Sequence, residues 1–190
     1  MVPGMSGPEI RTERLLLRRW RPSDREPFAA MNADPVVMEF FVGLQSPQVS
    51  YEMIDWFEEG FERDGFGLWA VEIPGELQLA GFVGLIRVSD EMPFAPAVEI
   101  GWRLTPSAWG RGIAREAADA ALDFGFGTAG LEEVVSLTAV LNERSWRLME
   151  RLGMRRDAGA DFDHPKVPAG HPLAPHVLYR LRRPAEVSTA

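Results

Sequence analysis

A turn with two glycines and two arginines is the first place in this sequence where residue types suggest chemistry. Residues 109–116 read WGRGIARE and follow the apolar run AVEIGWRLTP, so they join an expected strand to an expected helix. The first N–H groups of a helix lack partners within the helix, and the aligned peptide dipoles place about half a positive charge there. Gly110 and Gly112 leave these amides open to an oxyanion, and Arg111 and Arg115 add positive charge. The spacing therefore favours a site for phosphate or pyrophosphate.

The same turn is compatible with roles besides anion binding. A strand-to-helix turn with glycines can simply need unusual dihedral angles and close packing, and the pattern alone leaves this structural role open. A dinucleotide fingerprint, G-x-G-x-x-G, requires a third glycine where Arg115 stands, and three expected antiparallel strands precede the turn. A phosphate loop requires G-K-[ST], which the sequence lacks. The functional interpretation that remains is a pyrophosphate carried by something other than a dinucleotide.

A second candidate for chemistry is the glutamate of the strand that leads into this turn. In the run VEIGWRL, residues 98–104, the alternation places four apolar residues on one face and Glu99, Gly101 and Arg103 on the other. A carboxylate on the open face of a strand can act as a general base. It can equally pair with Arg103 farther along the same face, and the sequence leaves both roles open.

The turn and the segments around it resemble a known enzyme family. The run RGIARE is similar to motif A of the GNAT superfamily of acyl-CoA-dependent N-acetyltransferases, Q/R-x-x-G-x-G/A, with Gly112 and Ala114 at its two small positions. Trp109 replaces the usual Gln or Arg. That replacement, together with EIGWRLTPSAWGRGIARE and NERSWRLMERLGM, resembles the RimJ/RimL-type branch, which commonly has an aromatic residue before the glycines. The resemblance also covers TERLLLRRW and HPLAPHVLYRL, and so spans nearly the whole chain.

The resemblance implies a fold and a cofactor site. The fold is α/β (α+β): a mixed, mostly antiparallel sheet splayed beside the motif A helix and flanked by helices, with acetyl-CoA as acyl-donor cosubstrate between two parallel strands. The pyrophosphate of coenzyme A is expected on the amides of residues 110–115, and the pantetheine arm is expected to pair with the backbone near Leu104. No metal is expected. The implied cofactor-binding residues are Leu104, Thr105, Gly110, Arg111, Gly112, Ile113, Ala114, Arg115 and Asn142.

Acyl transfer from a thioester to an amine requires a neutral amine, a polarised carbonyl and a protonated leaving thiolate. A lysine-type amine with a pKa of about 10.4 costs about 4.6 kcal/mol to deprotonate at pH 7, whereas an α-amine with a pKa of about 7.8 costs about 1 kcal/mol. A strong base is therefore needed only for the first kind of acceptor. Glu99 is the candidate base, and RimJ/RimL-like sequences often carry Glu here.

The group that protonates or stabilises the leaving thiolate also follows from the resemblance. Many GNAT enzymes use a Tyr seven residues after the Asn that matches Asn142, but Met149 stands there, and methionine cannot donate a proton. Ser145, one turn after Asn142 on the same helical face, matches the position that RimJ/RimL-like enzymes use to hydrogen-bond the sulfur. The alternative role of Ser145 is a small residue that permits close approach of the cofactor. Glu99 and Ser145 are the predicted catalytic residues.

Hydrophobic periodicity and turn signals predict the elements that position these residues. A strand–helix–strand unit over residues 98–140 implies a parallel pair within an otherwise antiparallel sheet. The apolar stripe of its helix is mostly alanine, which predicts close packing on the sheet. The expected elements are a strand within 11–20, one or two short helices within 22–41 broken near Pro35, a helix at 47–63, three antiparallel strands between 66 and 106, a helix from 111 to about 127, a strand at 132–141, a helix at 142–153 and a last strand at 176–183.

Composition limits the classes of function. With 190 residues and 46% hydrophobic content, the chain suits one domain, residues 1–190, with an ordered core at about 10–183 and frayed ends. No apolar run approaches the ~20 residues of a membrane span, and no secretory signal is visible. The absence of cysteine excludes disulfides, thiolate catalysis and cysteine-bound metal. A net charge of −8 argues against nonspecific binding to nucleic acid. We therefore expect a cytoplasmic protein with no nucleic-acid or membrane partner.

Two further groups of residues are expected to be mainly structural. His164, His171 and His176 crowd the loop before the last strand, but their spacing fits no standard metal motif, and the DHP and GHP runs are typical of fixed turns. Four aromatic residues are candidates for the wall of an acceptor pocket if the helices pack as in the family, although core packing is their more ordinary role: Phe40, Phe41, Trp56 and Phe57.

These observations predict an N-acetyltransferase that moves the acetyl group of acetyl-CoA to a primary amine by direct attack in a ternary complex. The acceptor is either a protein N-terminal α-amine or a small-molecule amine, and the acidic balance favours a cationic one. The alternatives are a noncatalytic or regulatory acyl-CoA-binding protein, or an acyltransferase for another acyl-CoA such as succinyl-CoA, whose extra carboxylate an arginine near the thioester can hold. A dinucleotide oxidoreductase ranks behind both. A homodimer is compatible with each of these functions.

Overall fold

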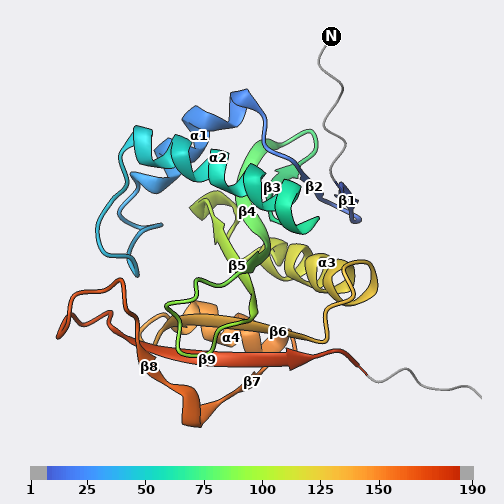
Figure 1. The fold of residues 1–190 in the computed structure, drawn as a ribbon. Helices are drawn as coiled ribbons and strands as arrows, with labels where there is room; N and C mark the ends of the chain where they lie inside the picture. The colour runs from blue at the N-terminus through green and yellow to red at the C-terminus, as the bar shows by residue number, and fades with distance from the viewer. Residues whose placement is uncertain (1–7, 185–190) are drawn as a thin grey trace, which may run out of the picture.

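A computed structural model describes residues 8–184 of the chain (Figure 1). The ends that the sequence predicts to be frayed, residues 1–7 and 185–190, lie outside this range. Short 3-10 turns lie at Pro22–Asp24, Pro106–Ala108 and Ala158–Ala160. The strands and helices are β1 (Ile10–Arg11), β2 (Leu16–Arg18), α1 (Arg25–Asn32), α2 (Pro47–Asp64), β3 (Leu68–Ile73), β4 (Leu77–Arg87), β5 (Val98–Leu104), α3 (Ile113–Gly127), β6 (Glu133–Ala139), α4 (Glu143–Arg151), β7 (Arg155–Arg156), β8 (Phe162–Asp163) and β9 (Pro175–Arg182).

The strands form one mixed sheet in the order β1-β2-β3-β4-β5-β6-β9-β7, and β8 pairs with β9. Neighbouring strands are antiparallel except β5 and β6, which are parallel, as the strand–helix–strand unit predicts. In this parallel pair of strands Glu99 of β5 is in register with Val135 of β6. Within residues 8–184, no other residue of β5 is paired with one of β6. Figure 1 shows β5 rising away from β6 beyond this point. The predicted GNAT-type architecture, a mixed and mostly antiparallel sheet that splays beside a long helix, is confirmed.

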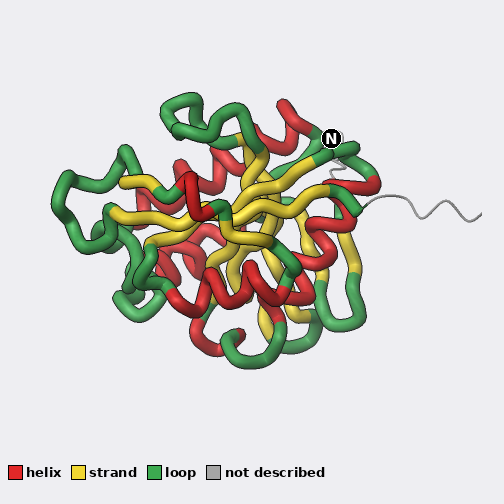
Figure 2. The backbone as a smooth tube through the Cα atoms, turned by 90° about the horizontal axis from the view of Figure 1, so that it is seen from below, coloured by secondary structure: helices red, strands yellow, loops and turns green. Residues whose placement is uncertain are grey.

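Helices cover both faces of the sheet, as the strands between helices in Figure 2 show. On one face α3 buries three alanines of its apolar stripe, Ala117, Ala118 and Ala121, which are inaccessible to solvent and confirm the predicted close packing. On the other face α1 and α2 bury Phe28 and Phe57 in a separate aromatic cluster. None of the helices within residues 8–184 has the length and apolar character needed to cross a membrane.

Three predictions need correction. The sequence does not predict strands β1, β7 and β8, because two residues are too short to show an apolar period. The helical segment within 22–41 ends at Asn32, and residues 33–46 form turns; the residue before Pro35 is disfavoured in helical conformation, and Asp34 accepts a hydrogen bond from the Val36 N–H instead. His176 lies in β9 and not in the loop before it.

A buried ion pair holds the first strands and helices together. Arg18 of β2 is 1% exposed, and Asp24, in the turn before α1, is fully buried. Two hydrogen bonds of 2.7 and 2.9 Å join their side chains, and Arg18 also binds Glu72 of β3 and donates to the Gln78 carbonyl of β4. One guanidinium thus connects three strands with the start of α1.

We predict that Asp24→Ala lowers the free energy of unfolding by about 3–5 kcal/mol, because it leaves a buried guanidinium with one of its two carboxylates. Urea denaturation measures this change. The matched control is Asp55→Ala, whose exposed pairing with Arg25 is worth at most about 1 kcal/mol. Equal losses in the two variants would contradict the central role of Arg18.

Candidate active site

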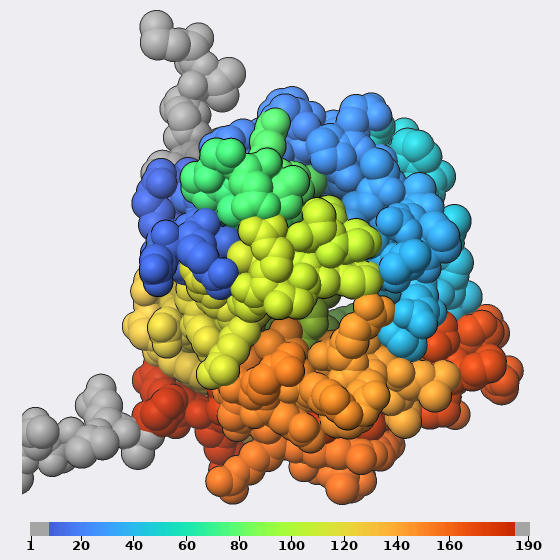
Figure 3. Space-filling model, turned by 180° about the vertical axis from the view of Figure 1, so that it is seen from behind, coloured from blue at the N-terminus to red at the C-terminus, as the bar shows by residue number. Residues whose placement is uncertain are grey.

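The free edge of β5 is the first feature of the site. The Thr105 N–H donates to the Ala80 carbonyl at 2.9 Å, so it points toward β4. Because N–H and C=O groups alternate in direction along a strand, Leu104 and Trp102 present theirs to the opposite side, toward the gap between β5 and β6. Of the two predicted backbone contacts to a pantetheine arm, Leu104 therefore faces the gap and the Thr105 N–H does not. Figure 3 shows an opening bordered by the yellow-green chain after β5, the light-blue segment between α1 and α2, and the orange chain at α4.

The glycine turn opens directly into α3. Gly110 and Gly112 have φ angles of +71° and +80°, in the region that favours glycine. The first bond of the helix runs from the Glu116 N–H to the Gly112 carbonyl at 3.0 Å, so the amides of residues 113–115 remain for an external acceptor. Beyond its chain neighbours, no heavy atom of the described part of the chain lies within 4 Å of the position that a Cβ at Gly110 would take. The unusual dihedral angles and the open amides are thus both present, and the geometry suits the predicted anion.

The two arginines of the turn differ in how they are paired. Arg111 makes a bidentate pair with Glu76, at 2.6 and 2.8 Å, and this hydrogen bonding holds the pKa of Glu76 below its usual value. Arg115 makes only a 3.5 Å contact with Asp119 and lines a hollow with Gly112 at the start of α3. Arg115 is therefore the more available cation for a phosphate at this helix end.

Glu99 lies at the pair where β5 and β6 part. Its carboxyl group forms no hydrogen bond or ion pair with the residues of the described chain, and its burial raises its pKa to about 8. The pairing with Arg103 that the sequence left open is not formed, because Arg103 donates to Asn32 Oδ1 at 2.8 Å instead. An isolated carboxyl group with a pKa near neutrality has the properties of a general base.

The start of α4 places the second predicted catalytic residue. Asn142 caps this helix: its Oδ1 accepts the Ser145 N–H at 3.3 Å, and its Nδ2 donates to Thr138 Oγ1 at 3.0 Å. The Ser145 side chain is half-buried, and its hydroxyl has no hydrogen-bond partner within residues 8–184. Met149 is fully buried in the core. Ser145 thus keeps a free hydroxyl, whereas Asn142 uses both side-chain atoms to position α4.

Sequence reasoning missed a contact across the opening. Trp109 Nε1 donates to the Leu104 carbonyl at 2.9 Å, which fixes the turn against the end of β5. The guanidinium of Arg144 lies 4.3 Å from the centroid of the Trp109 ring and binds Glu39 at 2.8 Å. Arg144 therefore connects α4, the glycine turn and the segment between α1 and α2. In the sequence, the aromatic residue before the glycines is the one sign of this contact, because no hydrophobic periodicity relates the glycine turn to α4.

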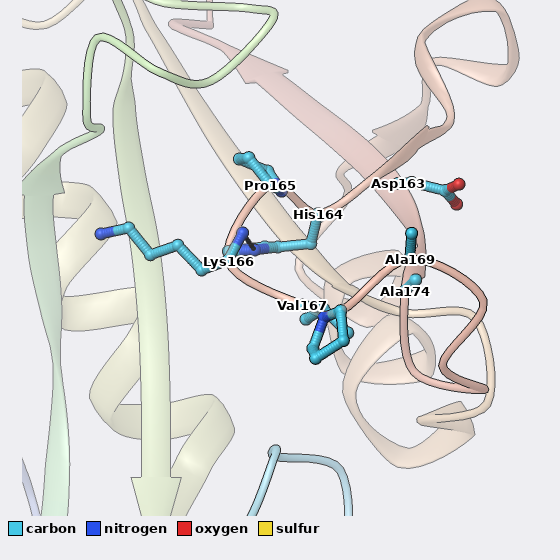
Figure 4. A pocket seen from close by; sticks show the side chains of 8 residues that line it. Asp163, His164, Pro165, Lys166, Val167, Ala169 and Ala174 are labelled. Atoms are coloured by element: carbon cyan, nitrogen blue, oxygen red, sulfur yellow. Dashed lines mark hydrogen bonds between the residues drawn. The ribbon is translucent and has the colours of Figure 1, made fainter.

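The histidines have the structural roles that the sequence predicts for them. The Lys166 and Leu173 N–H groups donate to Nδ1 of His164 and His171, each at 3.1 Å, and so fix two turns. Figure 4 shows the first of these bonds inside the loop that surrounds a shallow hollow. The rings of His164 and His176 lie 4.8 Å apart, and burial lowers the pKa of both. The contact between these two tilted rings joins the loop to β9.

Comparison with known proteins identifies related sequences. The family described as "Acetyltransferase (GNAT) domain" matches residues 14–155. The "Uncharacterized protein YkkB" of Bacillus subtilis is 30% identical over 144 residues, which cover 75% of this chain and 83% of that protein. The "Uncharacterized N-acetyltransferase YoaA" of the same organism is 26% identical over 79% of this chain and 84% of its own length.

Solved structures share the fold over almost the whole chain. A GNAT-family acetyltransferase from Bacillus anthracis superposes with a TM-score of 0.74 at 26% identity and covers 93% of this chain and 99% of its own. Ribosomal-protein-S5-alanine acetyltransferase from Vibrio fischeri has a TM-score of 0.74 at 17% identity, with 94% and 98% covered. Spermidine N-acetyltransferase from Vibrio cholerae, in complex with CoA and spermine, has a TM-score of 0.69 at 20% identity, with 90% and 97% covered.

We predict that Gly112→Ala lowers the free energy of unfolding by about 1–2 kcal/mol and weakens coenzyme A binding. A side chain is strained at φ +80°, and its Cβ would lie 3.4 Å from Arg14 Nη2. Urea denaturation and calorimetric titration measure the two effects. Gly127→Ala is the control: it lies in the same helix with nothing within 4 Å of its Cβ and should be neutral or slightly stabilising. Unchanged affinity and stability in Gly112→Ala would contradict both the strain and the anion site assigned to this turn.

Proposed function

The chain belongs to the acetyltransferase (GNAT) domain family and is an acyl-CoA-dependent acetyltransferase, and from this premise we propose that it transfers the acetyl group of acetyl-CoA to a primary amine by direct attack in a ternary complex. One observation carries the proposal. Three features lie around the gap where β5 and β6 separate. They are the edge of β5 that faces the gap, the open amides at the start of α3 and the isolated carboxyl group of Glu99. These are the groups that a thioester donor with a pyrophosphate and an amine acceptor require.

The residues around the gap fit coenzyme A in two ways. The amides of residues 113–115, together with Arg115, suit the pyrophosphate, because a helix start favours anions. The backbone of Trp102 and the N–H of Leu104, whose carbonyl accepts from Trp109, suit the amide-containing arm, which can pair with a strand edge as an added strand. When bound, acetyl-CoA supplies the activated acetyl group.

Two side chains of the protein then assist the reaction, one as a proton acceptor and one as a hydrogen-bond donor. Glu99 accepts the proton of the attacking amine as the bond between nitrogen and the acetyl carbon forms. With a pKa of about 8, roughly one-tenth of this carboxyl group is ionised at pH 7. The Ser145 hydroxyl hydrogen-bonds the sulfur as the carbon–sulfur bond breaks. No covalent bond to the enzyme is needed.

The finer assignment is to the RimJ/RimL-like branch, supported by Trp109 before the glycines and by Ser145 in the run NERS. The structural neighbours named for spermidine and for an alanine of a ribosomal protein act on different amines, so their names do not select one acceptor. We propose that residues 1–190 form a single acetyltransferase domain with its core at about 10–183. A cytoplasmic location and a homodimer stay predictions.

Glu99→Gln is expected to reduce kcat/KM about 10²–10⁴-fold, the usual contribution of a general base. In the wild type, kcat/KM should rise with pH and level off above about pH 8, because the ionised carboxylate is the active form. Thiol release from acetyl-CoA with a panel of primary amines measures both. A variant that keeps the wild-type rate and pH profile would exclude Glu99 as the base. Coenzyme A binding with no transfer to any amine would instead favour the noncatalytic alternative.

Glu99→Gln is expected to lower activity, but it should also remove a loss of stability that the wild type shows as the pH rises. The folded-state pKa of about 8 lies above the ordinary 4.5, so the folded protein binds the extra proton between these values. Wild-type stability should therefore fall as the pH rises from about 4.5 to 8, and Glu99→Gln should remove this contribution. Urea denaturation at pH 5 and pH 8.5 separates this effect from the loss of activity. A parallel fall in both proteins would contradict the raised pKa.

Ser145→Ala is expected to lower kcat about tenfold with little change in KM, because the hydroxyl stabilises charge on the sulfur only as the bond breaks. Ser89→Ala, in the loop between β4 and β5, is the control and should keep the wild-type kcat. Steady-state kinetics at saturating acetyl-CoA measure the effect. An unchanged kcat would assign Ser145 the alternative role of a small residue beside the cofactor.

A further inference from the structure

Arg103 differs from the other arginines of the described chain. It is largely enclosed by protein at the face of the sheet that α1 and α2 cover, and no carboxylate of residues 8–184 lies within ion-pair distance of it. Within residues 8–184, every other buried or half-buried arginine has a carboxylate partner: Arg18, Arg19, Arg25, Arg180 and Arg183. Arg103 is thus a cation beside the active site that the protein does not neutralise.

Neutral groups hold this guanidinium in place. Nη1 donates to Asn32 Oδ1 at 2.8 Å, and Asn32 is itself fully buried and donates to Ser50 Oγ at 3.1 Å. The rings of Phe41 and Phe82 lie 4.1 and 5.4 Å from the guanidinium carbon. Burial lowers the pKa of Arg103 only to about 10, so the group stays protonated at neutral pH.

One edge of the guanidinium lacks a protein acceptor. Nε is buried without a hydrogen-bond partner, and Nη2 has none within residues 8–184. A buried N–H group without a partner is costly, and a bound ligand with an acceptor atom is one way to satisfy it. The Nε–Nη2 edge is also the edge of arginine that matches a carboxylate with two parallel hydrogen bonds.

Gly101 leaves space on the face of β5 between Arg103 and the candidate base. Glu99, Gly101 and Arg103 lie on the same face of β5, and the Cα atoms of Glu99 and Arg103 are about 13 Å apart along the strand. Apart from its two chain neighbours, the only described residue within 4 Å of the position that a Cβ at Gly101 would take is Glu99, whose Oε1 lies at 3.7 Å. The glycine therefore leaves a recess over the strand, with a carboxyl group at one end and a guanidinium toward the other.

We propose that Arg103 binds a carboxylate of the acceptor, and that the acceptor is a small amine which carries its own carboxylate. This inference rests on the proposed function, because Glu99 must act on the amine of the same molecule. The acceptor's nitrogen lies toward Glu99 and its carboxylate toward Arg103, across the recess over Gly101. A polyamine would instead place an ammonium group beside an unneutralised guanidinium, which is repulsive.

The position of Arg103 assigns the carboxylate to the acceptor and not to the acyl donor. Arg103 is held by Asn32 of α1 and by Phe41 of the segment after α1, on the face of the sheet that α1 and α2 cover. The open amides for the donor's pyrophosphate are at the start of α3, which covers the other face. The acidic net charge of the whole chain favours cationic molecules at a distance, but a bound group meets the local positive charge of Arg103.

The test compares amines in matched pairs with acetyl-CoA: α- and ω-amino acids of increasing chain length, each beside its primary amide, with spermidine as a separate acceptor. We expect kcat/KM to be at least tenfold higher for the best amino acid than for its amide. Arg103→Gln should bring this ratio close to one, mainly through KM for the acid. Arg182→Gln is the control, because this exposed arginine at the end of β9 pairs with Glu133 and should keep the wild-type ratio.

The outcomes separate this inference from the proposed function. Transfer to amides or spermidine as efficient as to the acids overturns the carboxylate inference while acetyl transfer stands. Transfer to no amine at all overturns the proposed function. Succinyl transfer to neutral amines that depends on Arg103, without preference for acids in acetyl transfer, reassigns the carboxylate to the donor. If Arg103→Gln does not fold, as circular dichroism will show, the wild-type ratio of acid to amide still decides.

Discussion

The separation of β5 from β6 is the constraint on which the rest of the site depends. Each strand is held by a different antiparallel partner: β5 pairs with β4 over seven residues, and β6 pairs with β9 over seven. The two halves of the sheet meet in register at Glu99 and Val135, where Ser136 Oγ also donates to the Ile100 carbonyl. Beyond this point Trp109 Nε1 donates to the Leu104 carbonyl, and the other backbone groups on this edge of β5 need further partners, since buried backbone groups are almost always hydrogen-bonded. A bound arm with amide groups meets that need without any side chain.

The position of the anion site depends in turn on how α3 is fastened beside the gap. Glu116, in the first turn of α3, accepts hydrogen bonds from Thr12 and Arg14, and Arg14 donates to the Arg111 carbonyl. The segment before β2 therefore fixes both the glycine turn and the first turn of the helix. At the other side Trp109 ties the turn to Leu104. The open amides are fixed by contacts from both sides, so a bound phosphate needs little further ordering of the turn.

The sequence predicts the parts of this structure that are governed by local pattern. The alternation over residues 98–104 places Glu99 and Arg103 on the face opposite the four apolar residues, and the alanine stripe of α3 predicts its packing. Contacts between distant segments have no such signal. Arg103 reaches Asn32, 71 positions earlier, and the same spacing that puts Glu99 and Arg103 on one face does not reveal whether their side chains meet. The role of Trp109 likewise depends on Arg144, which only the packing of α4 brings near.

The failure of Glu99 and Arg103 to pair has a chemical consequence for both groups. In an ion pair the pKa of the carboxyl group would fall well below neutrality, and Glu99 would lose its basicity. Asn32 prevents this, because it holds the guanidinium away from Glu99, and Gly101 places no side chain between the two groups. The strand therefore presents a proton-accepting group and a fixed cation at a distance, with space between them. A molecule with an amine at one end and a carboxylate at the other offers each group the charge that it lacks, so the two groups that are destabilised in the free protein are stabilised together when it binds.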